Sequence, residues 1–294
     1  MPDITVLRAN LATLVLESCL YGILLLLFIS TIYFLATQRT LAGNSRTAKH
    51  NFTSLVFIGV ASLFIVVTAH WTIVIYQAFF AFIHLGNAVA EDAFYADLSQ
   101  LSEIMKITLF FTSSLIGDAL VIYRLWIIWG RHHYIMIFPM CSLTGGLVTA
   151  IGITYEFTKW EPRLRGAPFY AESRPWTATG FILTLMTTLY TTTFIASRIL
   201  RANKIRTSSE NGMMSFLTIL VESAGLQMIW MCFTAITQCV RSDAAFIAFS
   251  DTLPVIIGIA NLLIHARVGL GWSQDSAGPP RGRPPGKLNR EEFV

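Results

Sequence analysis

Long apolar stretches, each near the length of a membrane-crossing helix, recur along the chain. A helix needs about 20 mostly apolar residues to cross the ~30 Å hydrocarbon core of a bilayer. Seven stretches meet this requirement with few charged residues, and they predict an all-α membrane protein, a bundle of seven transmembrane helices. The predicted spans are residues 11–34, 52–79, 104–129, 134–157, 176–200, 213–237 and 246–269.

The second apolar stretch allows another interpretation. Residues 52–90 contain no Asp, Glu, Lys or Arg, and they are too long for one span yet barely long enough for two. His84, Gly86 and Asn87 fall where a second crossing would need its middle. We therefore expect one span that continues into a partly apolar loop helix, and an eight-span arrangement remains the alternative.

The overall composition agrees with a membrane protein. The 294 residues are 54% hydrophobic and only 13% charged, with a mean hydropathy of +0.60, whereas soluble domains carry about 25% charged residues. These values exclude a soluble globular, disordered or coiled-coil chain. Four cysteines in a chain of this length do not indicate a disulfide scaffold.

The distribution of Lys and Arg among the short connections predicts the orientation. Basic residues are more numerous after the first, third and fifth spans and in the C-terminal segment than on the other side. We therefore expect the N-terminus outside and the C-terminus in the cytoplasm, with the plasma membrane as the location. Residues 1–272 form the predicted transmembrane domain. Residues 273–294, rich in Pro, Gly and Arg, are predicted to be a flexible basic tail that is solvated or binds anionic lipid or a cytoplasmic partner.

Ionisable side chains within the spans are expensive in a bilayer and are expected to face the bundle interior or to snorkel. In the inner half we predict one polar network that holds the third and sixth spans together and to which polar residues of the seventh span belong. Arg124 lies near the inner end of its helix, so it either pairs with Glu222 or extends into the headgroups. The predicted members of this network are Asp118, Arg124, Glu222, Asn261 and His265.

A second group of titratable residues lies, by estimated depth, in the outer half of four different spans. Such groups can line a pocket that opens to the exterior, although independent residues near the interface are the alternative. The candidate outer pocket consists of Glu17, His70, Glu156 and Asp251.

The seventh span carries polar and small residues at alternating spacings of three and four, which places them on one helical face. Pro254 and Gly258 predict a bent, closely packed helix, because proline removes a backbone hydrogen bond and glycine permits close approach. The face is either a packing seam or the lining of a switch or ligand site. Its members are Asp251, Pro254, Gly258, Asn261 and His265.

Several kinds of chemistry lack their motifs in this sequence. The seventh span contains no lysine that could hold retinal as a Schiff base. No histidine pair has the spacing of metal ligands, and neither a serine-hydrolase nor a Walker motif is present. We therefore expect no cofactor, no metal and no catalytic residue, and we expect the bilayer rather than nucleic acid as a partner.

Three motifs resemble those of a large family of seven-span membrane proteins in basidiomycete fungi, most of which have no assigned function. The resemblance extends over residues 11–272 and implies the seven-helix fold, but it implies no ligand or catalytic role. Asn261 and His265 are less typical of that family. The motifs are Asp118-x4-Tyr123-Arg124-x4-Trp129, then Val221-Glu222-Ser223-Ala224, and finally Leu253–Ile259 followed by Arg267-Val268-Gly269-Leu270-Gly271.

The sequence leaves the biochemical function open. A receptor-like protein, with an external small-molecule or peptide ligand and a cytoplasmic protein partner, fits the predicted topology, although topology alone is only an analogy. A secondary transporter or proton-coupled permease fits the buried acids and histidines, since proton relays use such residues, but no internal repeat is visible. An intramembrane enzyme is the weakest hypothesis because no nucleophile or metal motif is present.

Overall fold

The computed structural model describes residues 4–41, 47–85, 88–95, 97, 100–159, 167–205, 210–240 and 243–276. Within these ranges the chain is helical and contains no strand. The elements are α1 (Ile4–Leu41), α2 (Thr47–Phe80), the π-helical turn η1 (Ala81–Leu85), α3 (Ala88–Tyr95), α4 (Leu101–Ile128), the 3₁₀ turn η2 (His133–Met136), α5 (Ile137–Thr158), α6 (Ala167–Ile205), α7 (Glu210–Val240) and α8 (Asp243–Ser276).

Seven of the described helices are long and apolar enough to cross a membrane, as the sequence predicts. Their candidate spans are Ala9–Phe34, Val56–His84, Leu101–Ile128, His133–Thr158, Pro175–Arg201, Leu220–Val240 and Ala245–Ile264. The apolar segment after the second span does not form an eighth crossing, because α3 has only eight residues. A helix of that length rises about 12 Å, well short of the hydrocarbon core.

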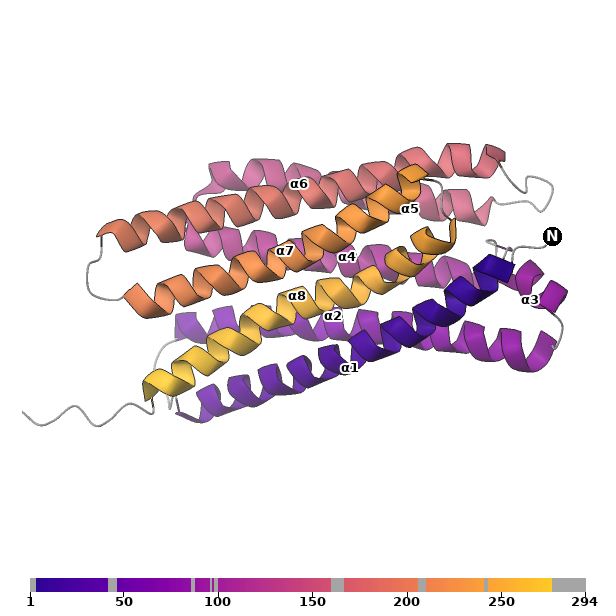
Figure 1. Cartoon of the computed structure of the whole chain (residues 1–294). Coiled ribbons are helices and arrows are strands. Elements are labelled where there is room, and N and C mark those ends of the chain that lie inside the picture. The colour runs from indigo at the N-terminus through magenta and orange to yellow at the C-terminus, as the bar shows by residue number, and fades with distance from the viewer. Residues whose placement is uncertain are drawn as a thin grey trace, which may run out of the picture.

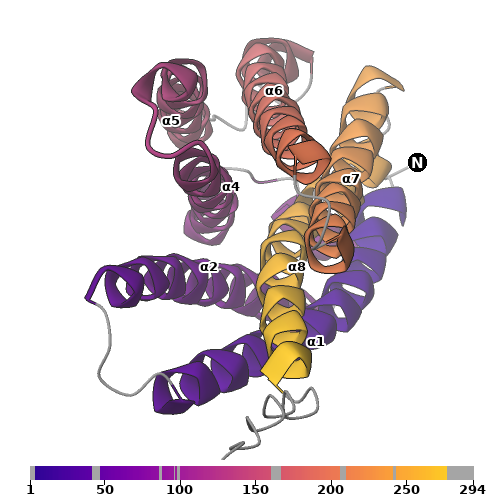
Figure 2. The ribbon, with the colours of Figure 1, turned by 90° about the vertical axis from the view of Figure 1, so that its left-hand side faces the viewer.

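The long helices run back and forth along one axis (Figure 1). The end-on view in Figure 2 shows α8 between α1, α2 and α7, and α8 also contacts α4. Of the apolar segment of α8, 67% is buried, compared with 39% or less in each other span. Its span is the most buried of the seven and it contacts α1, α2, α4 and α7, so α8 is the central helix of the bundle.

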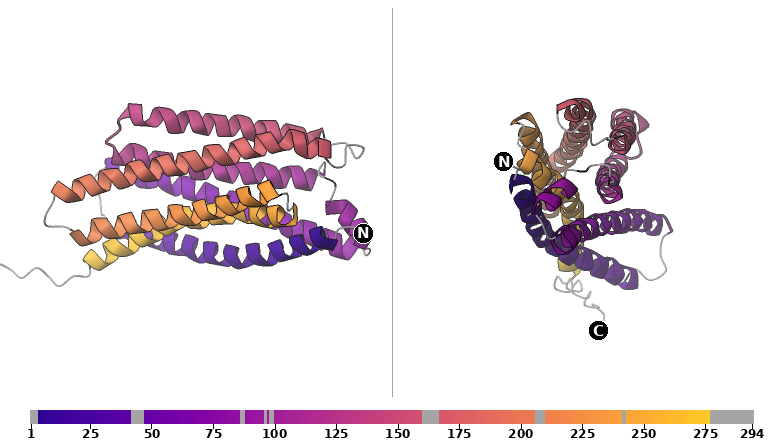
Figure 3. Two further views of the ribbon diagram at one scale, coloured as in Figure 1. Left: turned by 45° about the horizontal axis from the view of Figure 1, so that its top comes forward. Right: turned by 90° about the vertical axis from the view of Figure 1, so that its right-hand side faces the viewer.

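The two ends of the bundle differ. At one end α1 begins and the short helix α3 lies beside it (Figure 3); we name this the N-end. At the opposite end α4, α6 and α8 terminate (Figure 1), and we name this the C-end. The orientation of the two ends relative to a membrane remains the prediction drawn from Lys and Arg.

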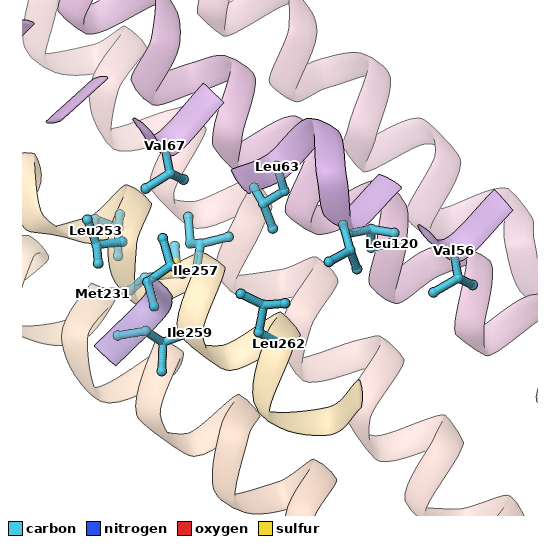
Figure 4. Packing of buried hydrophobic residues seen from close by; sticks show 12 residues of the cluster. Val56, Leu63, Val67, Leu120, Met231, Leu253, Ile257, Ile259 and Leu262 are labelled. Carbon is cyan, nitrogen blue, oxygen red and sulfur yellow. The ribbon is translucent and has the colours of Figure 1, made fainter. Parts of the chain in front are cut away.

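Aliphatic side chains from α2, α4, α7 and α8 fill the middle of the bundle (Figure 4). Leu63 on α2 and Ile257 on α8 are each 1% exposed, and Leu120 on α4 is 6% exposed. Glycine permits the closest helix contact: a Cβ atom on Gly117 would lie 2.5 Å from the Cγ2 atom of Ile257. The small residue therefore sets the separation between α4 and α8.

The last helix extends past the predicted domain boundary. Residues 273–276, which the sequence assigns to the tail, belong to α8, whereas the tail from residue 277 onward lies outside the described residues. Pro254 lies inside α8, which is assigned as one continuous helix. Just before this proline the Trp230 indole N–H on α7 donates to the Phe249 carbonyl at 3.0 Å. The same indole N–H also lies 3.0 Å from the Thr252 hydroxyl, so it joins α7 to α8 one turn before the proline.

Candidate functional site

A buried carboxylate–imidazole pair joins α1 to α2 near the N-end. The Glu17 Oε1 atom lies 3.0 Å from His70 Nδ1, and both side chains are 0% exposed. Glu17 Oε2 and His70 Nε2 have no hydrogen-bond partner among the described residues. A pair enclosed in this way is a site where a proton can reside on either residue.

A second ion cluster joins α4 to α8 at the same end. The Lys106 ammonium lies 2.8 Å from Glu103 Oε1 and 3.2 Å from Asp251 Oδ2. The Gln77 amide on α2 donates to Glu103 Oε2 at 2.7 Å and to Ser102 Oγ at 3.3 Å. These contacts connect α2, α4 and α8 through charge-assisted hydrogen bonds.

The Glu17–His70 pair and the contacts of Lys106 lie toward the same end of the bundle. We name the two groups together the N-end cluster. The two carboxylates that pair with Lys106 are partly exposed. The exposed fraction of the side chain is 17% for Glu103 and 14% for Asp251. The members of the N-end cluster are Glu17, His70, Gln77, Glu103, Lys106 and Asp251.

The N-end cluster is acidic. Its three carboxylates, when ionised, are opposed by one ammonium, so its charge is negative even with His70 protonated. A buried excess of negative charge is costly unless a cation or proton compensates for it. The site is therefore suited to a positively charged group.

The short helix α3 adds a tyrosine to the same end. Burial raises the pKa of Tyr95 to about 12, while Lys106 acts in the opposite direction and Glu103 and Glu91 act in the same direction. The Gln100 amide donates to the Phe94 carbonyl at 2.9 Å and ties α3 to the start of α4. The loop helix thus carries, at the N-end, a phenol that stays protonated at physiological pH.

A separate polar layer lies nearer the C-end. The Arg124 side chain on α4 is buried, and its Nη2 atom donates to the Asn261 carbonyl of α8 at 3.3 Å. The Asn261 amide donates to the Ile257 carbonyl at 3.0 Å. Both residues line a cavity of about 20 Å³ together with Ser223 and Gln227 of α7, a volume that fits a single water molecule.

Asp118 occupies a third polar position, midway between these groups along α4. Its side chain is 6% exposed and forms a hydrogen bond with Thr184 of α6. Thr184 lines a second cavity of about 20 Å³ with Ser114 and Thr149. Hydroxyl groups therefore provide the polar surroundings that a buried carboxyl requires.

The structure brings together some of the residues predicted from the sequence. Glu17, His70 and Asp251 of the candidate outer pocket belong to the N-end cluster. Glu156 does not, because its helix α5 contacts α4, α6 and η2 but not α1, α2 or α8. Its side chain is half-buried.

The predicted inner network is also divided. Arg124 and Asn261 are in direct contact, whereas Asp118 is bonded to α6. The Glu222 side chain is exposed on α7, and its pairing with Arg124 stays a prediction. His265 belongs to α8, but its side chain lies outside the described residues.

Sequence reasoning missed three members of the N-end cluster. Glu103 precedes the predicted third span and Lys106 lies in its first turn, and neither is among the predicted site residues. Gln77 lies inside the predicted second span and carries no charge. The i, i+3 spacing of Glu103 and Lys106 is a usable signal, since such residues are neighbours on a helix. Their partners on α2 and α8 require knowledge of which helices pack together.

Among the described residues no group of three or more His, Cys, Asp or Glu side chains is arranged to hold a metal ion. No protein-family model, curated protein or solved structure matches the chain. The resemblance to the basidiomycete family accordingly rests on the sequence motifs alone.

Proposed function

We propose that this multi-pass membrane protein is receptor-like, with a positively charged external ligand at the N-end cluster and a cytoplasmic protein partner at the C-end. The proposal places the protein in the plasma membrane with the N-end outside, in accordance with the distribution of Lys and Arg. The ligand is a small amine or a basic peptide.

One observation carries the proposal: α4 is attached to the central helix α8 at two levels. At the N-end the attachment is the ion pair of Lys106 and Asp251 at 3.2 Å. Nearer the C-end it is the hydrogen bond from Arg124 to the Asn261 carbonyl at 3.3 Å. A cation that competes with Lys106 for Asp251 would weaken the ion pair at the N-end. This change would in turn affect the Arg124–Asn261 hydrogen bond, which joins the same two helices.

The charge of the site supports the ligand class. Glu103 and Asp251 are the partly exposed carboxylates of the N-end cluster, and carboxylates bind ammonium and guanidinium groups through charge-assisted hydrogen bonds. An anionic ligand would add to the excess of negative charge, which costs free energy in a partly buried site.

The experiment is a thermal-shift screen of the purified full chain in lipid nanodiscs against amines, basic peptides and matched acidic compounds. We expect a cationic compound to raise the melting temperature of the wild-type protein and to lose this effect in Asp251→Asn. Lys159→Ala, which removes an exposed lysine outside the cluster, is the control. Stabilisation that is confined to acidic compounds, or that persists in Asp251→Asn, would refute the proposed ligand site.

A proton-coupled transporter is the second candidate, and the enclosed Glu17–His70 pair favours it. Histidine exchanges protons near physiological pH, and carboxylate–histidine pairs serve as proton relays in membranes. Proton flux into liposomes that depends on both His70 and Glu17 would favour transport. Absence of flux from liposomes in which the protein responds to a cationic ligand would favour the receptor.

A further inference from the structure

At the C-end, two arginines lie over the rings of two tryptophans at the end of α4. The Arg131 Cζ atom lies 5.6 Å from the ring centroid of Trp126, and the Arg198 Cζ atom lies 5.5 Å from that of Trp129. Trp126 lies in the last turn of α4 and Trp129 is its C-cap, three residues later, so the two rings lie near one another at the end of the helix. Cation–π contacts of this kind orient a guanidinium while leaving its N–H donors available.

The rings themselves are fixed by α6. The Trp129 indole N–H donates to the Phe194 carbonyl at 3.2 Å, and the centroids of the two rings are 5.8 Å apart. This contact brings Arg198 of α6 to the end of α4. We name the surface made by Trp126, Trp129, Arg131 and Arg198 the arginine–tryptophan corner.

The backbone holds Arg131 in a conformation that few non-glycine residues adopt. Gly130 has a φ angle of 65° and Arg131 one of 67°. The Arg131 N–H donates to the Trp126 carbonyl at 2.9 Å, and the Gly130 N–H donates to the Ile127 carbonyl at 3.0 Å, which is the Schellman pattern of a helix end. A left-handed backbone conformation is unfavourable for arginine. The chain adopts it where α4 ends, and in this conformation the Arg131 side chain lies back over Trp126.

The corner is strongly basic. Neither Arg131 nor Arg198 forms an ion pair with a described residue, and both side chains are exposed. His132, His133 and Arg201 are exposed beside them. The contributing segments, residues 123–140 and 190–205, contain no Asp or Glu, so they carry no negative charge of their own.

The corner also lies at the boundary of the membrane-spanning segments. The third span ends at Ile128 and the fourth begins at His133, so Arg131 lies in the connection between them. Arg198 lies within the last turn of the fifth span, which ends at Arg201. This position is the level of lipid headgroups, where tryptophan rings are also favoured.

We propose that the arginine–tryptophan corner binds the headgroup of an anionic phospholipid. The two guanidinium groups donate to phosphate and carboxylate oxygens of the headgroup, while the indole rings lie against its glycerol and upper acyl region. The surface takes a lipid rather than a free anion, because the rings offer an apolar contact that only the lipid can occupy. The inference is independent of the proposed receptor function.

The test measures binding of short-chain dioctanoyl phosphatidylserine to the full chain in neutral detergent by thermal shift. Dioctanoyl phosphatidylcholine and inorganic phosphate serve as separate comparisons. Loss of each arginine should weaken phosphatidylserine binding about fivefold, which is the order expected for one basic residue at an anionic surface. Higher salt should also weaken binding, because these charges are exposed.

Two variants separate lipid binding from folding. Arg131→Gly removes the charge but is fully compatible with the left-handed backbone, so it should preserve the fold and weaken binding; Arg198→Ala in the same chain should weaken it further. Lys159→Ala is the matched control, because its ammonium lies 4.2 Å from the Tyr155 ring at the opposite end of the bundle. Binding that is unchanged in the double variant, equally reduced in Lys159→Ala, or equalled by phosphatidylcholine or inorganic phosphate would overturn the proposal.

Discussion

Lys106→Met tests whether the N-end cluster holds α4 against α8. The substitution removes the ammonium that lies 2.8 Å from Glu103 and 3.2 Å from Asp251, and it leaves both carboxylates without their cation. Glu103 retains the Gln77 amide at 2.7 Å, so the larger loss falls on Asp251.

The expected cost is substantial because the lysine side chain is only 7% exposed. Removal of one partner from a buried ion pair costs about 3–5 kcal/mol, and the partial exposure of the carboxylates places this variant near about 3 kcal/mol. At roughly 2–4 °C per kcal/mol for a domain of this size, the melting temperature should fall by about 6–12 °C.

The assay is thermal unfolding of the purified protein in detergent, followed by circular dichroism. The exposed Lys159 serves as the control, and Lys159→Met should cost at most about 1 kcal/mol. The double variant Lys106→Met/Asp251→Leu should recover part of the loss, because an apolar replacement no longer leaves a buried unpaired charge. A single variant as stable as Lys159→Met, or a double variant that loses the sum of both effects, would refute the role assigned to the ion pair.

Two further predictions concern Gly117 and Tyr95, and a third concerns the orientation predicted from Lys and Arg. Gly117→Ala should destabilise the protein by about 1–3 kcal/mol in the same unfolding assay, because its Cβ would lie 2.5 Å from Ile257 Cγ2; Gly225→Ala, with nothing within 4 Å, should cost nothing. Because burial raises the pKa of Tyr95 to about 12, absorbance titration at 295 nm should show a late-ionising phenol that Tyr95→Phe removes. The stability that this protonated phenol contributes should be complete below about pH 10 and should disappear as the pH rises through about 12. A glycosylation reporter fused after Val294 should stay unmodified if the C-terminus is cytoplasmic, and its modification would reverse the orientation.

The seven spans were predictable from the sequence because hydrophobic length is a local property. A crossing helix must satisfy its own backbone groups, so about 20 apolar residues nearly determine the element. The same argument decides whether residues 52–90 form one span or two. The helix that follows Leu85, α3, has only eight residues and is too short to cross. The ends were less predictable, as the extension of α8 through Ser276 shows.

The N-end cluster was only partly predictable because it depends on contacts between distant segments. The sequence identified Glu17 and His70 as costly intramembrane residues, and these lie 3.0 Å apart although 53 positions separate them. The same reasoning grouped them with Glu156, whose helix packs on the other side of α4 and α6. Depth along a helix follows from residue number, but the direction in which a side chain faces depends on the packing partner.

The attachment of α4 to α8 at two levels is the central claim, and hydrogen–deuterium exchange in nanodiscs tests it most directly. The comparison is between the wild-type protein, Lys106→Met and the control Lys159→Met, with peptides that cover Val121–Ile128 of α4 and Ile257–Ile264 of α8. Both peptides lie toward the C-end, but we expect Lys106→Met to accelerate exchange in both of them. Loss of the ion pair between Lys106 and Asp251 should also weaken the second contact between α4 and α8, which is the hydrogen bond from Arg124 to the Asn261 carbonyl. Acceleration confined to the N-end, with both peptides as protected as in Lys159→Met, would contradict the coupling through α8.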